Sequence, residues 1–329
     1  MKTIELGNSG VRVSPIIMGC WGIAGGYTWG DQDEKESIDT IRAAIDCGVT
    51  TFDTAEFYSE GYSEEVLGKG LGADRKNAVI ATKIWTTNMA GDRVAAAVNG
   101  SLKRLNTDYI DLLQIHWLDP ELKVEETLKA MEKMKESGKV RAIGVCNHGC
   151  SQLAEALETS EIVTNQLSYS LFFRAIEFEI ADYCKQNNVG ILAYSPLAQG
   201  LLTGKFRKPE DVNDERARLR FYSKDRPGTV HQEPGCEKEI FSAIEKIENV
   251  CRENSLSMGN AAISWLLQKS EVSAVIVGAR NPKQMIRNAE AMELRLSDEL
   301  VVKLDELTRP VKSKLGPNAD PWRTESRIV

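Results

Sequence analysis

Short apolar segments alternate with amphipathic segments along almost the whole chain. The apolar segments are continuous rather than alternating with polar residues, which is typical of strands in a parallel sheet covered on both faces. The sequence predicts eight such strands, at residues 13–19, 49–54, 77–84, 109–117, 139–146, 162–167, 190–195 and 273–278. Helical patterns lie between them, for example at 34–47, 92–105, 124–137 and 175–186.

Eight strand–helix units in one chain predict an α/β fold, the (β/α)8 or TIM barrel, as a single domain over residues 1–329. A doubly wound sheet is the alternative, but its GxGxxG fingerprint is missing after the first strand. The glycines that do follow this strand, Gly22, Gly25 and Gly26, have a different spacing. The pattern therefore favours the barrel.

Three segments lie outside the repeat. The N-terminal residues 3–14 contain the turn Asn8-Ser9-Gly10 and predict a β-hairpin that closes the bottom of the barrel. The charged segment 206–237, after the seventh strand, is either a solvated surface loop or a lid over a ligand. The C-terminal residues 309–329 are expected to form an extended arm rather than a helix.

Composition and charge exclude several classes of function. A net charge of −7 argues against broad binding to nucleic acid or to acidic membranes. The N-terminus lacks the apolar core of a signal peptide and no apolar run could span a bilayer, so we expect a cytoplasmic protein. The cysteines form no CxxC pair. Cys146 and Cys150, with His148 between them, lack a second ligand pair, so no metal site is expected.

Four polar residues lie at or just after the ends of adjacent predicted strands, where reactive groups gather in a (β/α)8 barrel. They are Asp53, Tyr58, Lys83 and His116. Each alone has an ordinary structural explanation, such as a helix cap or a satisfied core histidine. Together they predict one catalytic site.

The chemistry of this set is specific. A phenol has a pKa of about 10, and the ammonium of Lys83 is expected to lower that of Tyr58. Asp53 would pair with Lys83, and His116 could orient a carbonyl oxygen or relay a proton. Such a site suits carbonyl reduction, in which Tyr58 protonates the oxygen as hydride reaches the carbon. It suits acyl transfer poorly, because no serine or cysteine nucleophile is paired with a base.

Over nearly its whole length the sequence resembles the aldo-keto reductase superfamily. FDTAEFYSEGYSEEVLGKGL at 52–71 is similar to the family signature DTAxxYG…SE. Further blocks in the family order are ATK, LLQIHW, IGVCNH, NQLSYS, YSPLAQGLLTGK and VIVGARNPKQMIRNAEA. The resemblance implies NADP(H)-dependent reduction of an aldehyde or ketone. Tyr58 would be the general acid/base, and Asp53, Lys83 and His116 would complete the tetrad.

The resemblance also implies where the cofactor lies. Asn147 and Gln166 would hold the nicotinamide carboxamide, and Tyr194 would stack on the ring. The pyrophosphate would contact Ser195, Pro196, Leu197, Gly200 and Lys205. The adenosine end would contact Gly278, Arg280, Gln284 and Asn288. Trp21 and Asp53 complete the implied cofactor set.

The residues at the eighth strand support the adenosine assignment independently. Asn281 is a good N-cap and Pro282 a good first residue, so a helix should begin just after Arg280. A helix N-terminus binds phosphate well, and Arg280 adds a permanent charge, which points to the 2′-phosphate of NADP rather than to NAD.

Three positions depart from the family pattern. Cys146 replaces a serine beside Asn147, His148 replaces a phenylalanine, and Arg287 replaces a glutamate that faces the adenine.

Tryptophans at the same face are expected to form the substrate pocket: Trp21, Trp85 and Trp117 follow strands, and Trp117 is the best candidate for contact. Trp29 is as well explained by loop packing. Neither the substrate nor the oligomeric state follows from the sequence.

Three alternatives stay open. Potassium-channel beta subunits share the implied fold, cofactor and tetrad, so a regulatory partner protein is possible. The same site could act mainly as a sugar or inositol dehydrogenase. An aldolase or isomerase using Lys83 as a Schiff base is disfavoured, because Asp53 should keep Lys83 charged.

Overall fold

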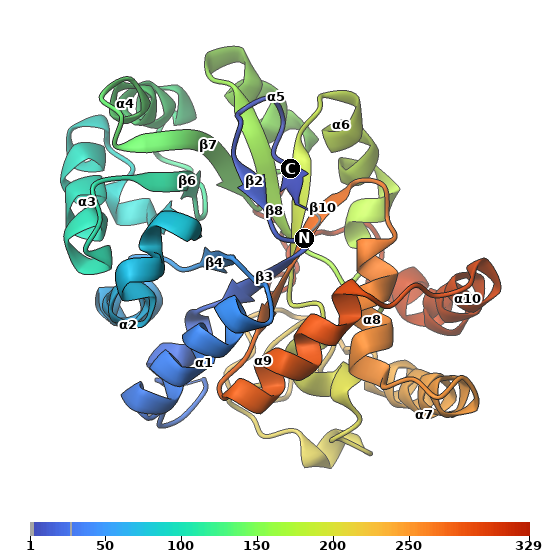
Figure 1. The fold of residues 1–329 in the computed structure, drawn as a ribbon. Helices are drawn as coiled ribbons and strands as arrows, with labels where there is room; N and C mark the ends of the chain where they lie inside the picture. Colours follow the sequence, from blue (N-terminus) through green and yellow to red (C-terminus); the bar gives the residue numbers. More distant parts are fainter. Residues whose placement is uncertain (1–2, 27) are drawn as a thin grey trace.

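The computed structural model describes residues 3–26 and 28–329 of the chain (Figure 1). Eight parallel strands form a closed barrel in the order β10-β3-β4-β5-β6-β7-β8-β9. The strands are β3 (Ile16–Gly19), β4 (Thr51–Asp53), β5 (Val79–Ile84), β6 (Ile110–Ile115), β7 (Val140–Cys146), β8 (Ile162–Ser168), β9 (Gly190–Tyr194) and β10 (Val272–Gly278). All eight fall within or overlap the predicted strands, and the predicted barrel is confirmed.

Helices surround the barrel, as Figure 1 shows in a view along its axis. They are α1 (Glu34–Asp46), α2 (Tyr62–Leu71), α3 (Gly91–Leu105), α4 (Val124–Glu136), α5 (Cys150–Thr159), α6 (Ile180–Gln186), α7 (Glu237–Glu253), α8 (Met258–Leu267), α9 (Pro282–Ala289) and α10 (Asp298–Leu315). The helix predicted at 175–186 is two elements, because Glu179 has a non-helical backbone (φ −157°) between a 3₁₀ turn and α6. Among the described residues, no helix is long and apolar enough to cross a membrane.

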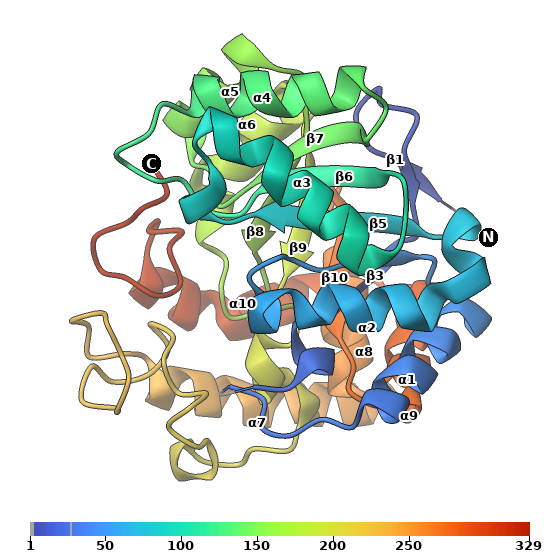
Figure 2. The same ribbon diagram turned by 90° about the vertical axis from the view of Figure 1, so that its left-hand side faces the viewer.

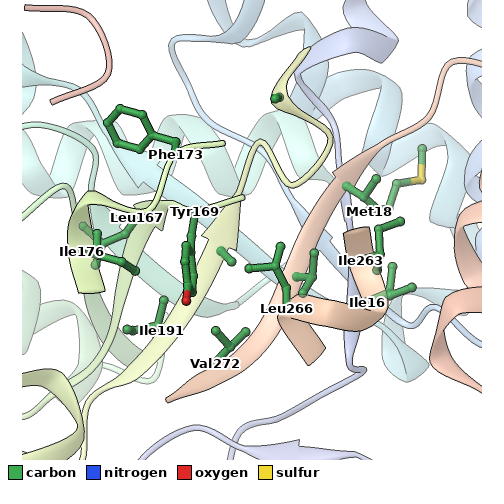
Figure 3. Packing of buried hydrophobic residues seen from close by; sticks show 14 of the residues in the cluster. Ile16, Met18, Leu167, Tyr169, Phe173, Ile176, Ile191, Ile263, Leu266 and Val272 are labelled. Atoms are coloured by element: carbon green, nitrogen blue, oxygen red, sulfur yellow. The ribbon is translucent and has the colours of Figure 1, made fainter. Parts of the chain in front are cut away.

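The layer between strands and helices is apolar. Figure 3 shows part of it, where Ile16 and Met18 of β3 lie near Ile263 and Leu266 of α8. All four side chains are fully buried. Burial of a side chain of this size stabilises the fold by roughly 1.5–3 kcal/mol, so this layer holds the helices against the barrel.

The predicted N-terminal hairpin is present. β1 (Ile4–Glu5) pairs antiparallel with β2 (Arg12–Val13). Leu6, Val11 and Val13 are buried against the small and branched side chains that point into the barrel. The hairpin therefore closes the end of the barrel at which the strands begin.

The segment 206–237 and the C-terminal tail lie on the side of the molecule opposite the hairpin (Figure 2). The segment contains one short 3₁₀ turn, Pro209–Asp211, and is otherwise irregular. It is not a plain solvated loop, because Phe221 and the guanidinium of Arg220 are buried. Arg220 donates to the carbonyl oxygens of Leu315 and Asn318, both at 2.8 Å, so the segment packs against the tail.

The expectation of an extended arm from residue 309 is wrong for its first seven residues, since α10 continues through Pro310 to Leu315. A proline inside a helix costs about 3 kcal/mol. Burial of Leu304, Val311 and Leu315 on one face of α10 offsets that cost. Beyond Gly316 (φ 68°) the tail is irregular, as expected.

Candidate active site

The ends of β4, β5 and β6 lie side by side, which brings the first predicted group together. Lys83 is buried at the end of β5 and its Nζ lies 2.6 Å from Oδ1 of Asp53, the last residue of β4. The same amine donates to the carbonyl oxygen of Thr54 at 2.7 Å and lies 3.3 Å from the hydroxyl of Tyr58. The structure therefore places three of the four predicted catalytic residues in direct contact.

Charge pairing decides the state of Lys83. Burial lowers the pKa of its amine, but the surrounding groups, first among them the carboxylate of Asp53, together outweigh this effect, and the net pKa lies above the ordinary value. Lys83 is thus a charged, fixed ammonium. A neutral lysine available for a Schiff base does not fit this geometry.

Tyr58 differs from its predicted state. Burial raises the pKa of its phenol to about 12, although the charge of Lys83 acts in the opposite direction. The predicted net lowering is therefore wrong, because the cost of burying a phenolate exceeds the attraction of one ammonium already paired with Asp53. At neutral pH Tyr58 carries its proton and is suited to donate it.

His116 directly follows β6, and its ring centre lies 5.7 Å from that of Tyr58 at an angle of 83°. Burial, and then the charge of Lys83, hold the pKa of His116 well below its usual range. Its Nδ1 is buried without a hydrogen-bond partner in the described part of the chain. His116 is therefore neutral and can contribute a hydrogen bond but not a positive charge.

Three predicted nicotinamide contacts meet next to this group, at the ends of β7, β8 and β9. Asn147 has a left-handed backbone (φ 58°), and its Oδ1 accepts from the hydroxyl of Tyr194 at 2.9 Å. The Nδ2 of Asn147 donates to the carbonyl oxygen of His116 at 3.1 Å. Gln166 donates to Oδ2 of Asp53 at 2.8 Å. The backbone N–H of Asn147 donates to the carbonyl oxygen of Gln166 at 2.9 Å, so hydrogen bonds join the predicted nicotinamide site to the Asp53–Lys83 pair.

The predicted pyrophosphate segment begins after β9 and has an unusual backbone. Ser195, Ala198 and Gln199 have left-handed φ values of 55°, 47° and 55°. Strain of this kind is concentrated at functional sites. Pro196 and Leu197 lie within this segment.

Gly200 (φ 101°) lies against Lys205 in the same segment. A Cβ at residue 200 would come within 2.7 Å of the Lys205 side chain. Burial, and then the charge of Arg216, lower the pKa of Lys205 to about 8. Lys205 and Arg216 thus form a pair of cations that lacks a neutralising carboxylate among the described residues.

Arg216 and its neighbour Arg218 are residues that the sequence reasoning missed. The guanidinium of Arg216 lies 5.2 Å from the ring centre of Trp29, and its Nε is buried without a partner in residues 3–26 and 28–329. Arg218 donates to the hydroxyl of Thr28 at 2.8 Å. The segment 206–237 therefore reaches the loop after β3, although the only sequence signal was its abundance of charge.

The residues predicted to contact the adenosine end lie around the start of α9, and the predicted helix start is confirmed. Oδ1 of Asn281 accepts from the backbone N–H of Gln284 at 2.9 Å, and Pro282 is the first helical residue. Gln284 in turn accepts from the backbone of Arg280, and Asn288 donates to the carbonyl oxygen of Gly278 at 3.2 Å. Arg287, which departs from the family pattern, is exposed on α9 and does not disturb these contacts.

Aromatic rings surround Tyr58 and His116. The ring of Trp21 stacks beside Tyr58 with centres 6.0 Å apart, and that of Trp85 meets His116 edge-on at 5.1 Å. Phe57, which the sequence reasoning missed, stacks on Trp85 with centres 3.8 Å apart and is 52% exposed. Phe57 could have been predicted from the sequence, since it directly precedes Tyr58.

Trp117 is placed differently from the other two predicted substrate contacts. The guanidinium carbon of Arg327 lies 3.7 Å from the centre of the Trp117 ring. Nε and Nη2 of Arg327 donate to the carboxylate of Asp320 at 2.7 and 3.0 Å. Within the described chain, no aromatic contact joins Trp117 to Tyr58 or His116. The C-terminal tail therefore covers Trp117 and lies beside the site.

The closed barrel, with a buried Lys–Asp pair against a tyrosine at the ends of its strands, defines a barrel oxidoreductase. The chain belongs to the aldo/keto reductase family, whose family model matches residues 15–309. The resemblance stated from the sequence is thereby confirmed.

Relatives of this chain span nearly its full length. Aldo-keto reductase YhdN of Bacillus subtilis (strain 168) is 35% identical, over 99% of this chain and 100% of that protein. The NADH-specific methylglyoxal reductase of Escherichia coli (strain K12) is 31% identical, over 91% of this chain and 95% of that protein. The solved structure of an aldo-keto reductase from Klebsiella pneumoniae in complex with NADPH gives a TM-score of 0.74 at 27% identity, covering 93% and 95% of the two chains.

Proposed function

We propose that this protein reduces the carbonyl group of an aldehyde or ketone to an alcohol with NADPH, and that Tyr58 supplies the proton. The observation that carries the proposal is the contact of the Tyr58 hydroxyl with the Lys83 ammonium, which Asp53 holds at 2.6 Å. When bound, NADPH supplies the hydride. The chain supplies the proton and the electrostatic stabilisation.

The high pKa of Tyr58 suits carbonyl reduction, in which Tyr58 donates its proton. A phenol with a pKa of about 12 keeps its proton until negative charge develops on the substrate oxygen. Once the proton has moved, the ammonium of Lys83 stabilises the phenolate that remains. Asp53 keeps the ammonium in place, and the neutral ring of His116 can orient the carbonyl oxygen by a hydrogen bond.

The residues present fit a dinucleotide with phosphates. Lys205, which is exposed, and Arg216, which is half-buried, are cations without a carboxylate partner in the described chain, which suits a pyrophosphate. Arg280, at the start of α9, suits the 2′-phosphate of NADPH. The NADPH bound to the Klebsiella protein supports this choice. The E. coli relative is NADH-specific, and a titration of this protein with NADPH and NADH tests the preference.

The pocket walls favour a flat, apolar substituent on the carbonyl. Trp21 stacks beside Tyr58 and Trp85 meets His116 edge-on, while Phe57 covers one face of Trp85 and is itself half exposed. Trp117 contributes at the edge, under Arg327. The same residues serve alcohol oxidation in the reverse direction, so a dehydrogenase role would use this site unchanged.

The decisive experiment follows NADPH and NADH oxidation by the purified protein with a panel of aldehydes, ketones and sugars. For Tyr58→Phe we expect kcat to fall by about 10²–10⁴-fold, the usual worth of a general acid, with the Kd for NADPH changed less than about twofold. Tyr62→Phe is the matched control, because Tyr62 lies at the surface and bonds Glu34.

Two results would count against the proposal. Turnover by Tyr58→Phe at the wild-type rate would remove Tyr58 from the reaction. Tight NADPH binding by the wild-type protein without turnover of any carbonyl would instead favour the regulatory partner alternative.

A further inference from the structure

The side chain of Arg280 crosses to the loop between β3 and α1 and is held there by three acceptors. Its Nε donates to Oε1 of Gln32 at 2.7 Å, and its Nη1 donates to the carbonyl oxygen of Trp29 at 2.6 Å. Its Nη2 donates to the carbonyl oxygen of Asp31. These contacts join positions about 250 residues apart in the chain.

All three acceptors are neutral. In the part of the chain that the structure describes, no carboxylate forms an ion pair with Arg280. A guanidinium has five N–H donors, and three are used here, so one N–H on each terminal nitrogen remains. Arg280 is therefore fixed in orientation while its positive charge is uncompensated, which is the state of an arginine prepared for an anion.

Gln32 contributes more to this arrangement than any other side chain. Besides accepting from Nε, it donates through its own Nε2 to the carbonyl oxygen of Arg280 at 2.9 Å. It thus fixes both the backbone and the guanidinium of the same residue. Trp29 and Asp31 contribute only backbone oxygens, which a substitution would leave in place.

The loop that carries these acceptors is itself constrained. Gly26 and Gly30 exchange two backbone hydrogen bonds, at 3.1 and 2.7 Å. Asp33 ends the loop by accepting from the backbone N–H of Glu36 at 2.7 Å, which caps α1. The acceptors are therefore presented by a closed turn and a helix start.

We propose that Gln32 is a positioning residue that holds Arg280 for the 2′-phosphate of the cofactor and so sets the preference for NADPH over NADH. The proposal rests on the cofactor site proposed above. Its physical basis is preorganisation: the orientation of Arg280 is fixed before binding, so the 2′-phosphate gains a charge-assisted contact without ordering a long side chain.

The test uses 2′,5′-ADP and 5′-AMP, which differ only in the 2′-phosphate, in calorimetric titrations of the full chain. We expect the wild-type protein to bind 2′,5′-ADP at least about tenfold more tightly than 5′-AMP. Gln32→Ala should lose most of that preference, with the affinity for 5′-AMP changed less than about twofold. Gln32→Glu should lose more of the preference for 2′,5′-ADP. Its carboxylate still accepts from Nε of Arg280, but it neutralises the positive charge of Arg280.

The unchanged affinity for 5′-AMP also shows that each variant is folded at this site. Gln186→Ala, an exposed glutamine at the end of α6, is the control and should match the wild type for both ligands.

Three outcomes would overturn the proposal. Equal weakening of both ligands by Gln32→Ala would make Gln32 a general support of the loop. An unchanged or tighter affinity for 2′,5′-ADP would mean that Gln32 does not prepare Arg280, or competes for it. A wild-type protein without preference for 2′,5′-ADP would reject the 2′-phosphate assignment itself, whatever the variants show.

Discussion

The two ends of the proposed cofactor site hold positive charge in opposite ways. At the nicotinamide end, the ammonium of Lys83 is buried and paired with Asp53, so the site is close to neutral before anything binds. At the phosphate end, Lys205, Arg216 and Arg280 have no ion pair among the described residues. The first charge is balanced by the protein, and the others are left for a ligand to balance.

This difference follows from what each charge has to do. A charge that acts on a transition state must stay fixed and charged throughout turnover, and a buried carboxylate achieves both. A charge that binds a phosphate gains most when it is unpaired beforehand, because the anion then relieves an unfavourable state. The lowered pKa of Lys205, set by burial and by Arg216, is the signature of that unfavourable state.

The largest expected effect comes from breaking the pair at the nicotinamide end. Lys83→Met leaves the carboxylate of Asp53 buried and without its cation, which costs about 3–5 kcal/mol of unfolding free energy. It also removes the charge that stabilises the phenolate of Tyr58, so kcat should fall by at least about 10²-fold. Urea unfolding and steady-state kinetics measure the two effects.

Lys69→Met is the matched control for this change. Lys69 pairs with Glu34 at the surface, where the two side chains are 50% and 38% exposed. Surface pairs of this kind contribute about 0–1 kcal/mol. If the two variants lost similar stability, the distinction between a paired catalytic charge and an ordinary ion pair would fail.

The fold and the clustering of Asp53, Tyr58, Lys83 and His116 at the strand ends could be predicted because both depend on local sequence. Continuous apolar strands indicate a covered parallel sheet, and a polar residue at the end of such a strand has a known position in a barrel. Asp53, Lys83 and His116 all satisfied that rule. The pKa of Tyr58 could not be predicted, because its net direction depends on how deeply the phenol is buried.

Residues that act across the fold were missed for a related reason. Arg216 and Gln32 lie in irregular segments, and their contacts join parts of the chain far apart in sequence. The helical continuation through Pro310 was missed because a local rule about proline was outweighed by burial of Val311 and Leu315. Local sequence patterns thus predict the polar residues at the strand ends but not the loop residues whose contacts join distant parts of the chain.

Removal of a cation at the phosphate end should have a smaller and different effect. Arg216→Ala should weaken NADPH and NADH alike, by about tenfold, because both carry the pyrophosphate. The unfolding free energy without cofactor should stay within about 0.5 kcal/mol, since no buried carboxylate loses a partner. Fluorescence titration and urea unfolding measure these quantities.

Arg252→Ala, an exposed arginine on α7, provides the control for Arg216→Ala. A large loss of stability in Arg216→Ala would place Arg216 with Lys83 as a structural charge. A loss of affinity for NADPH alone would move Arg216 from the pyrophosphate to the 2′-phosphate.

The smallest expected effect is a pH dependence that belongs to the phosphate end alone. The pKa of Lys205 is lowered to about 8, so its amine is charged below pH 8 and becomes neutral above it. An anion binds the charged form, so the Kd for NADPH should rise as the pH passes through 8, by up to about tenfold between pH 7 and pH 9. Lys205→Arg keeps its charge over this range, and its Kd should stay nearly constant. If the Kd of the variant rose with pH as that of the wild type does, another group would be responsible. The proposal that the unpaired amine of Lys205 binds the phosphate would then be contradicted.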